Sequence, residues 1–360
     1  MDPIIGHEAI QRELASLAVS ADPPHALLFV GPDNTGRKVL ARHFAMLLNC
    51  ERAAGGEVAR GSMFGEEASA TVSLPCGECR SCRLIADDRH PDVVVVGPGD
   101  AFCKPRPGDA SHAVHPLARD IRICQVRGMI ETVARYPFEA RYRVIVLDPA
   151  DRLTRDAANT MLKTLEEPPG HTVFALISAA PEAIIETVVS RCRRVDVRTV
   201  AKPVMEAALL ARGVDPQVGA AAATAARGRP GLAVAFAQQP DLAGDRDRHL
   251  RRCAAMAAAR MTERLRYSDD LAKRARTDRP HLNSQLDIWE AFWSDQLHRA
   301  AGEPAFGDSA AILGALRAVT QARQDILANV LPRPALDLML LSFPRLTLSD
   351  TLRDETASNA

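Results

Sequence analysis

Residues 30–40 read VGPDNTGRKVL and carry part of a phosphate-binding pattern. A complete loop reads G-x-x-x-x-G-K-[ST]: backbone N–H groups and the lysine hold the phosphates, and the hydroxyl binds Mg²⁺. Gly31 and Gly36 keep this spacing, but Arg37 stands at the lysine position and Lys38 at the hydroxyl position. Arginine and lysine differ in shape, so Arg37 is not expected to reach the β and γ phosphates as the loop lysine does, and the cationic Lys38 cannot bind Mg²⁺. The pattern predicts a degenerate nucleotide site, and the alternative is a strand–helix turn with coincidental glycines.

A second position bears on the same site. Asp148 follows the apolar run 144–147, and an acidic residue at the end of such a strand normally helps to hold the Mg²⁺ of a nucleotide. Hydrolysing proteins of this architecture place a glutamate next, but here the next residue is Pro149, which has no acid–base chemistry. We therefore expect no productive binding of ATP. The alternative is an active ATPase in which Lys38 replaces the missing lysine after a slip of one residue.

The stretch CGECRSC places Cys76, Cys79 and Cys82 at C-x₂-C-x₂-C spacing. This spacing lets thiolates converge on one zinc ion, and iron–sulfur clusters or unliganded thiols are the alternatives. Cys50, at the end of a predicted helix, could supply the fourth ligand, and the other candidates are Cys103, Cys124 and His90. Four protein ligands leave no open coordination position, so the predicted site is structural.

The elements that could position the loop, Asp148 and the cysteines include four continuous apolar runs: 26–30, 93–96, 144–147 and 173–177. Runs without polar alternation are typical of strands buried on both faces of a parallel sheet. Helices predicted between them include 38–48 and 154–167; Thr154 is the expected N-cap of the second, and Pro168 prevents its continuation. Strands that alternate with helices predict a three-layer α/β domain over 1–200.

After about residue 200 the alanine-rich and amphipathic segments contain no strand-like run. We expect a helical bundle over 201–243, a larger all-helical domain over 244–348 and a polar tail over 349–360. The segments 51–75 and 98–116 are rich in Gly, Pro and small residues and are predicted to be loops.

Two further stretches indicate a protein family more specifically than the loop does: DAANTMLKTLEEPPGHTVFALIS at 156–178 and VVSRCRR at 188–194. They closely resemble the sliding-clamp loader subunits of bacterial DNA polymerase III, members of the AAA+ superfamily, and the order of motifs along residues 1–235 agrees. The motor subunits of this family keep an intact loop and the glutamate, whereas delta-prime subunits often lack a competent nucleotide site yet keep Ser-Arg-Cys. This sequence resembles the delta-prime kind.

The resemblance implies an AAA+ domain with an inserted zinc module at about 50–82, a helical lid over 201–243 and an oligomerisation (collar) domain over 244–348. It implies that Ser190, Arg191 and Cys192 form a motif whose arginine completes the ATP site of a neighbouring subunit, because arginine stabilises charge on a transferred phosphoryl group. Cys50 matches the family's first zinc cysteine.

The resemblance also implies partners. They are the gamma/tau and delta subunits of a hetero-oligomer, the sliding clamp and, through the complex, primed DNA. Ser178 stands where the family has a γ-phosphate-sensing residue, and Arg229 where it has a second sensor; an ordinary exposed turn is the alternative for Arg229.

Composition limits the other functions. The formal net charge is zero and only 4% of the residues are aromatic, which disfavours a nucleic-acid reader that acts by a basic, base-stacking surface. The N-terminus does not resemble a signal peptide, and no apolar run reaches the roughly 18 residues of a membrane span. We expect a cytoplasmic protein without a membrane partner, whose eight cysteines are reduced.

Overall fold

The computed structural model describes residues 3–20, 22–54, 75–99, 102–103, 118, 120–302, 308–327 and 330–346. The chain forms two compact units, Met1–Val234 and Ala235–Ala360. Among the described residues, no helix is long and apolar enough to cross a membrane.

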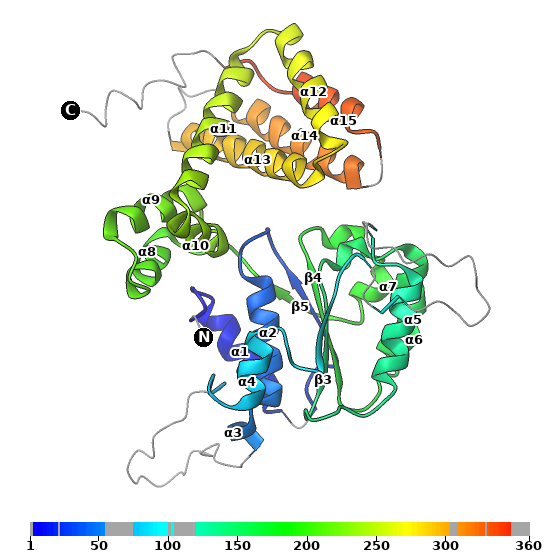
Figure 1. Ribbon diagram of the computed structural model, residues 1–360. Helices are drawn as coiled ribbons and strands as arrows, with labels where there is room; N and C mark the ends of the chain where they lie inside the picture. The colour runs from blue at the N-terminus through cyan, green and yellow to red at the C-terminus, as the bar shows by residue number, and fades with distance from the viewer. Residues whose placement is uncertain are drawn as a thin grey trace. The chain divides into compact units, whose positions relative to one another are not determined.

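The first unit contains a five-stranded sheet in which all neighbouring strands are parallel (Figure 1). Its strands, in the spatial order β2-β3-β4-β1-β5, are β1 (Ala26–Val30), β2 (Val93–Val96), β3 (Arg143–Leu147), β4 (Thr172–Ser178) and β5 (Arg193–Asp196). The four predicted strands are confirmed. The fifth was not predicted, because β5 lies at the sheet edge and its sequence, RRVD, buries only Val195.

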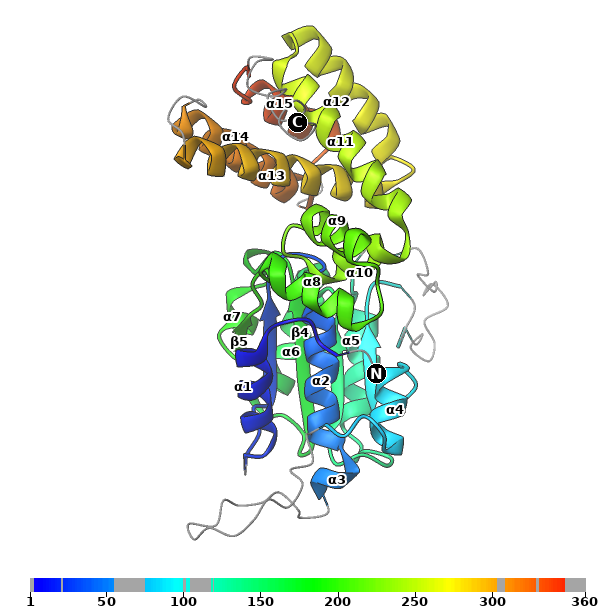
Figure 2. The same cartoon turned by 90° about the vertical axis from the view of Figure 1, so that its left-hand side faces the viewer.

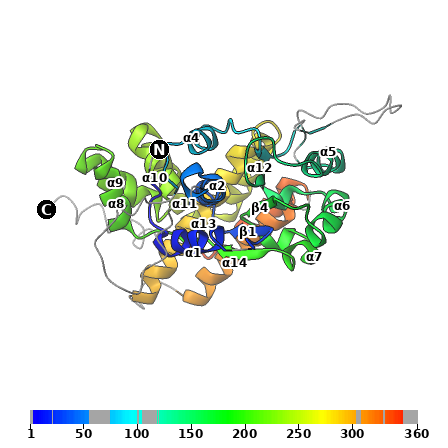
Figure 3. The same ribbon diagram turned by 90° about the horizontal axis from the view of Figure 1, so that it is seen from below.

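Helices cover both faces of this sheet, as the α/β prediction requires. In Figure 3, α1 (Glu8–Ala18), α2 (Arg37–Asn49) and α4 (Arg80–Ala86) lie on one side, and α5 (Ile123–Val133), α6 (Arg155–Glu166) and α7 (Glu186–Val189) lie on the other. Figure 2 looks onto the first of these layers. The parallel sheet is therefore sandwiched, which explains why its strands are apolar without alternation.

Alternate residues of each strand enter two separate cores. Leu27 and Phe29 of β1 pack with α1 and α2, whereas Leu28 and Val30 pack with α5, α6 and α7. All five residues of β1, all five of β3 and all seven of β4 are buried. Because parallel strands share one direction, their carboxyl ends meet at a single edge, where ligands bind in open sheets of this kind.

The predicted helices 38–48 and 154–167 correspond to α2 and α6. Thr154 is the N-cap of α6: its Oγ1 accepts a hydrogen bond from the N–H of Ala157 at 3.3 Å. The predicted loop 51–75 begins with a short helix, α3 (Glu51–Ala54), and the rest of it to residue 74 lies outside the described residues. Most of the predicted loop 98–116 also lies outside them.

After the sheet come α8 (Lys202–Ala211), α9 (Pro216–Ala226) and α10 (Pro230–Gln238), and α8 packs against α9. The second unit is built from α11 (Pro240–Ala258), α12 (Met261–Ala275), α13 (Arg279–Gly302), α14 (Ser309–Leu327) and α15 (Pro332–Leu341). Its described part is helical, as predicted. The unit division falls at Val234, and the boundaries expected at 200 and 243 stay predictions.

The core of the second unit is formed around the two tryptophans of the chain. Trp289 and Trp293 are fully buried in α13, and the ring of Phe343 lies 4.8 and 5.0 Å from theirs. Arg264 is buried beside this core and donates hydrogen bonds to five backbone carbonyls around the ends of α11 and α15.

Candidate functional site

The loop predicted to be a degenerate phosphate site lies at the carboxyl edge of the sheet, between β1 and α2, in a strand–loop–helix setting. Gly31 is required sterically, because a Cβ there would lie 2.1 Å from the carbonyl oxygen of Val197. Gly36 has φ 102° and caps α2, and Asn34 also has a positive φ of 63°. The loop therefore keeps a backbone that requires glycine at positions 31 and 36, and Asn34 adds a side chain between them.

Both cations of the loop are engaged by carboxylates of the same chain. Arg37 is 8% exposed, and its guanidinium forms an ion pair with Asp33, inside the loop. Lys38 Nζ lies 3.8 Å from Asp148 Oδ2, beyond the end of β3. Burial raises the pKa of Asp148, and the positive charges of Lys38 and Arg37 oppose that rise. The groups that would meet phosphate and Mg²⁺ thus neutralise one another.

Two other segments contact the loop backbone. His7 Nε2 lies 2.8 Å from the carbonyl oxygen of Thr35, and the N–H of Gly231 donates to the carbonyl oxygen of Asn34 at 2.9 Å. A Cβ at Gly231 would lie 3.1 Å from that same oxygen. The RGRPGLA stretch that includes Arg229 therefore brings Gly231, in the first turn of α10, onto the loop.

Ser178, at the end of β4, is fully buried. Its Oγ donates to Asp151 Oδ1 at 2.7 Å and accepts from the N–H of Ala180 at 3.0 Å. The Ser178 hydroxyl is thus buried and already bonded to two groups of its own chain. Pro149 follows Asp148 directly, so the position of a water-activating glutamate carries no functional group.

The Ser-Arg-Cys motif lies at the end of α7. Arg191 Nη1 donates to the carbonyl oxygen of Thr187 at 2.7 Å, and Nη2 pairs with Glu166, the last residue of α6. The Arg191 side chain is 33% exposed. Cys192 points toward the core under α7, and burial raises the pKa of its thiol to about 12, so it is uncharged.

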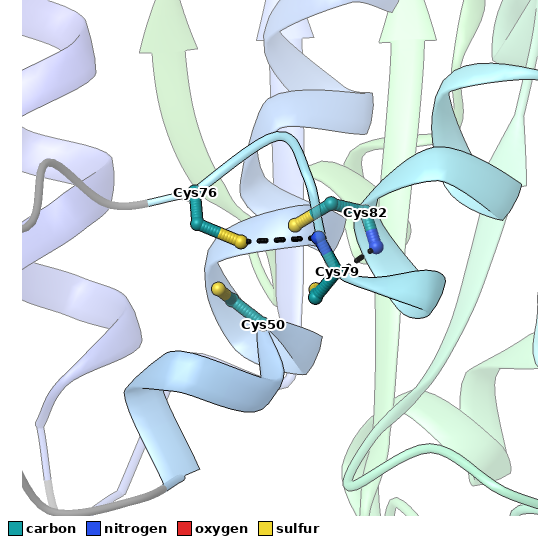
Figure 4. A group of neighbouring side chains, drawn as sticks. All are labelled: Cys50, Cys76, Cys79 and Cys82. Carbon is teal, nitrogen blue, oxygen red and sulfur yellow. Dashed lines mark hydrogen bonds between the residues drawn. The ribbon is translucent and has the colours of Figure 1, made fainter.

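The structure brings Cys50, Cys76, Cys79 and Cys82 together at the opposite end of α2. Their sulfur atoms all lie within 4.8 Å of one another, and Figure 4 shows the four side chains pointing toward a common centre. Cys50 is the C-cap of α2, and Cys79 is the N-cap of α4.

This arrangement fits a zinc ion. In a tetrahedron with Zn–S bonds of about 2.3 Å, the sulfurs are about 3.8 Å apart, which small side-chain adjustments can reach. The N–H of Cys79 donates to Cys76 Sγ at 3.3 Å, and the N–H of Cys82 donates to Cys79 Sγ at 3.4 Å (Figure 4). Such N–H···S bonds stabilise thiolates. Burial alone would raise the pKa of Cys76, but the backbone N–H groups of Cys79 and Glu78 and the thiols of Cys50 and Cys79 outweigh it and lower that pKa to about 7.

The other fourth-ligand candidates lie elsewhere. Cys103 Sγ is 3.5 Å from Cys124 Sγ, which belongs to α5 on the other face of the sheet. His90 contacts Ser81 Oγ at 3.4 Å and accepts a hydrogen bond from the N–H of Asp92. Within the described ranges, the group of four cysteines is the one that could hold a metal ion.

A buried ion pair that the sequence patterns did not predict lies at the amino-terminal edge of the sheet, at the start of β2 and β3. Asp92 is fully buried, and Arg143 Nη2 donates to its Oδ1 at 2.9 Å. Asp92 also accepts the backbone N–H groups of residues 138–140, which hold a loop where Tyr136 and Phe138 are each 83% exposed. An aspartate directly before an apolar strand, and an arginine at the start of the next, were the available signals.

Comparisons with known proteins agree with the family that the order of motifs indicated. Residues 6–201, more than half of the chain, match the family described as DNA polymerase III, delta subunit. The chain is 34% identical over 178 residues to the DNA polymerase III subunit delta' of Pseudomonas aeruginosa, which covers 49% of this chain and 44% of that protein. It is 27% identical over 194 residues to the delta' subunit of Bacillus subtilis, covering 54% and 48%.

A tau subunit is also similar. The chain is 32% identical over 199 residues to DNA polymerase III subunit tau of Bacillus subtilis, which covers 55% of this chain and 29% of that protein. These matches span less than half the length of each relative. A gamma subunit-related protein of DNA polymerase III from Thermotoga maritima matches in structure with a TM-score of 0.41 and 13% identity, covering 92% of this chain and 97% of that chain. The match over residues 6–201 shows that the chain belongs to the DNA polymerase III delta subunit family.

Proposed function

We propose that the chain is the delta-prime subunit of a DNA polymerase III clamp loader and does not itself hydrolyse ATP. The observation that carries this proposal is the state of the loop, where Arg37 pairs with Asp33 and Lys38 pairs with Asp148. A phosphate would have to displace both carboxylates, and Mg²⁺ would find neither a hydroxyl at position 38 nor an unpaired Asp148. Pro149 removes the remaining catalytic group.

The same subunit supplies an arginine to a neighbouring ATP site. Arg191 carries a cationic side chain that is partly exposed just after the short helix α7, so a phosphate of another chain can reach it. An arginine provided in trans stabilises the charge that builds on the transferred phosphoryl group. A subunit whose own nucleotide site is defective can in this way remain essential for ATP hydrolysis in the neighbouring subunit.

Assembly would use the helical parts. We assign residues 201–243 to a lid and residues 244–348 to a collar domain that contacts the gamma/tau and delta subunits. On α15, Leu338 and Leu341 are 64% and 41% exposed, and Leu331, directly before it, is 73% exposed. Apolar side chains at this spacing form one face of a helix, which suits burial against a partner helix.

In this assembly the protein acts in the cytoplasm, and the complex opens the sliding clamp and places it on primed DNA. The four-cysteine cluster holds a structural zinc ion that joins α2 to α4. It takes no part in the reaction, because four thiolates fill the coordination sphere.

The decisive experiment compares the reconstituted complex containing the wild-type chain with one containing Arg191→Ala. We expect assembly to be unchanged and steady-state ATP hydrolysis to fall partially, because one of several sites loses its cation. Clamp loading should fall further if the sites act together. The matched control is Arg194→Ala, a nearby exposed arginine of β5 that pairs with Asp196. Equal rates for all three complexes would refute the role of Arg191.

A second candidate is an active ATPase of the gamma/tau kind. The position of the Lys38 side chain favours this candidate. Lys38 follows the lysine position of the loop pattern by one residue, yet its ammonium group reaches Asp148 at the carboxyl edge of the sheet. Calorimetric titration of the isolated chain with Mg·ATP separates the two candidates, since micromolar binding with turnover would support the ATPase and exclude a non-hydrolysing subunit.

A further inference from the structure

Two acceptors of its own chain hold the guanidinium group of Arg191. Nη1 donates to the carbonyl oxygen of Thr187 at 2.7 Å, and Nη2 pairs with the carboxylate of Glu166. The two acceptors come from different helices, α7 and α6, which pack against each other. The plane of the guanidinium is therefore defined by the fold before any ligand arrives.

Glu166 is well placed to act as a fixed anchor. It is the last residue of α6, directly after Leu165, which is 1% exposed, and one turn beyond Met161 and Leu162, which face the core. Its own side chain is 49% exposed, at the surface where Arg191 lies. The carboxylate thus stands on a rigid element while its charge remains accessible to the arginine.

The hydrogen-bond capacity of arginine leaves room for a phosphate. A guanidinium group has five N–H donors in one plane. The contacts with Thr187 and Glu166 use one hydrogen of each terminal nitrogen, so three donors remain. Arg191 can therefore stay paired with Glu166 and still offer its remaining N–H groups to phosphate oxygens.

We propose that Glu166 is a positioning residue for Arg191 in the neighbouring ATP site. This inference rests on the proposed function, in which Arg191 acts in trans. The carboxylate restricts a long, rotamer-rich side chain to one orientation, so the orientation does not have to be established in the transition state. A surface ion pair of this kind contributes modestly, which corresponds to a change of about two- to fivefold in rate.

The test uses the reconstituted complex with ATP, clamp and primed DNA. Glu166→Gln should slow turnover about two- to fivefold at the one site that Arg191 completes. The kcat of the whole complex should therefore fall by no more than it does with Arg191→Ala, and KM for ATP should stay nearly unchanged, because orientation matters most in the transition state. Glu166→Asp keeps the charge on a shorter side chain and should recover part of the loss. The control is Glu167→Gln: its side chain is exposed and, within the described residues, belongs to no ion pair.

The double variant Glu166→Gln with Arg191→Ala decides whether the glutamate acts through the arginine. We expect it to match Arg191→Ala alone, since a positioning residue has nothing left to position. A further loss in the double variant, or a rate increase for Glu166→Gln, would overturn the inference. If Arg191→Ala lowers kcat while Glu166→Gln behaves like Glu167→Gln, only this inference fails. If Arg191→Ala has no effect, the proposed function fails first.

Discussion

Lys38 Nζ lies 3.8 Å from Asp148 Oδ2, so the second residue of helix α2 faces the carboxylate that directly follows strand β3. In a working site these two positions would meet a nucleotide and its Mg²⁺. Here they meet each other. The pair is partly exposed, with side-chain exposures of 41% and 25%, so its strength is modest and its main consequence is the neutralisation of both groups.

The isolated chain should therefore not bind Mg·ATP with micromolar affinity. Calorimetric titration measures this directly. A double variant, Arg37→Lys with Lys38→Thr, restores the lysine and the hydroxyl of the loop pattern and should bind Mg·ATP at least about tenfold more tightly than the wild type. Micromolar binding by the wild type would contradict the prediction, and equal binding by the double variant would show that Asn34 or the loop contacts block the site.

The purified protein should contain about one zinc ion per chain, and Cys79→Ser should lose it. Because metal-binding energy is also folding energy, we expect the melting temperature of the first unit to fall by roughly 5–15 °C. Elemental analysis and a thermal melt provide the measurements. Cys124→Ser, a change at a partly buried thiol outside the cluster, is the control and should keep the metal. Iron in place of zinc would refute the assignment.

Asp92→Asn should destabilise the first unit by about 3 kcal/mol, because it leaves the buried guanidinium of Arg143 without its counter-charge. Burial acts to raise the pKa of Asp92, but the backbone N–H groups of 138–140 and Arg143 outweigh it and lower that pKa. A folded pKa below the unfolded value of about 3.9 gives stability that is present at neutral pH. That stability is lost as the pH falls below about 4, through the folded pKa.

Denaturant unfolding of the wild type and of Asp92→Asn at pH 7 and in steps below pH 4 checks this pair. The difference between the two proteins should shrink as the pH falls. Asp87→Asn, at an exposed residue that ends α4, should behave like the wild type at every pH. A constant difference would mean that the asparagine acts through packing and not through charge.

Arg264→Met should destabilise the second unit by about 2–4 kcal/mol, because it leaves buried carbonyl oxygens without donors. Arg264→Lys should recover only part of this, since an ammonium group has three donors and no planar fork. Both tryptophans of the chain lie in α13, so tryptophan fluorescence during urea unfolding reports this unit selectively. Arg266→Met, at an exposed position of α12, is the control and should change the midpoint little.

The sequence by itself determined the features that depend on neighbouring residues. The four continuous apolar runs predicted β1 to β4, because a strand buried on both faces needs no polar alternation. Thr154 and Pro168 bounded helix α6 correctly through local capping and steric effects. The ordered motifs over 156–194 led to the family that the comparison over 6–201 then showed.

The tertiary structure alone decided which distant groups meet. Strand β5 forms because a parallel neighbour offers Val195 a buried position, although RRVD has no strand-like pattern. Cys50 joins the other cysteines because α2 ends beside the start of α4, whereas Cys103 and Cys124 pair on the opposite face of the sheet. Ion pairs such as Arg191–Glu166 depend on how two helices pack, and packing is a property of the whole fold that no short stretch of sequence encodes.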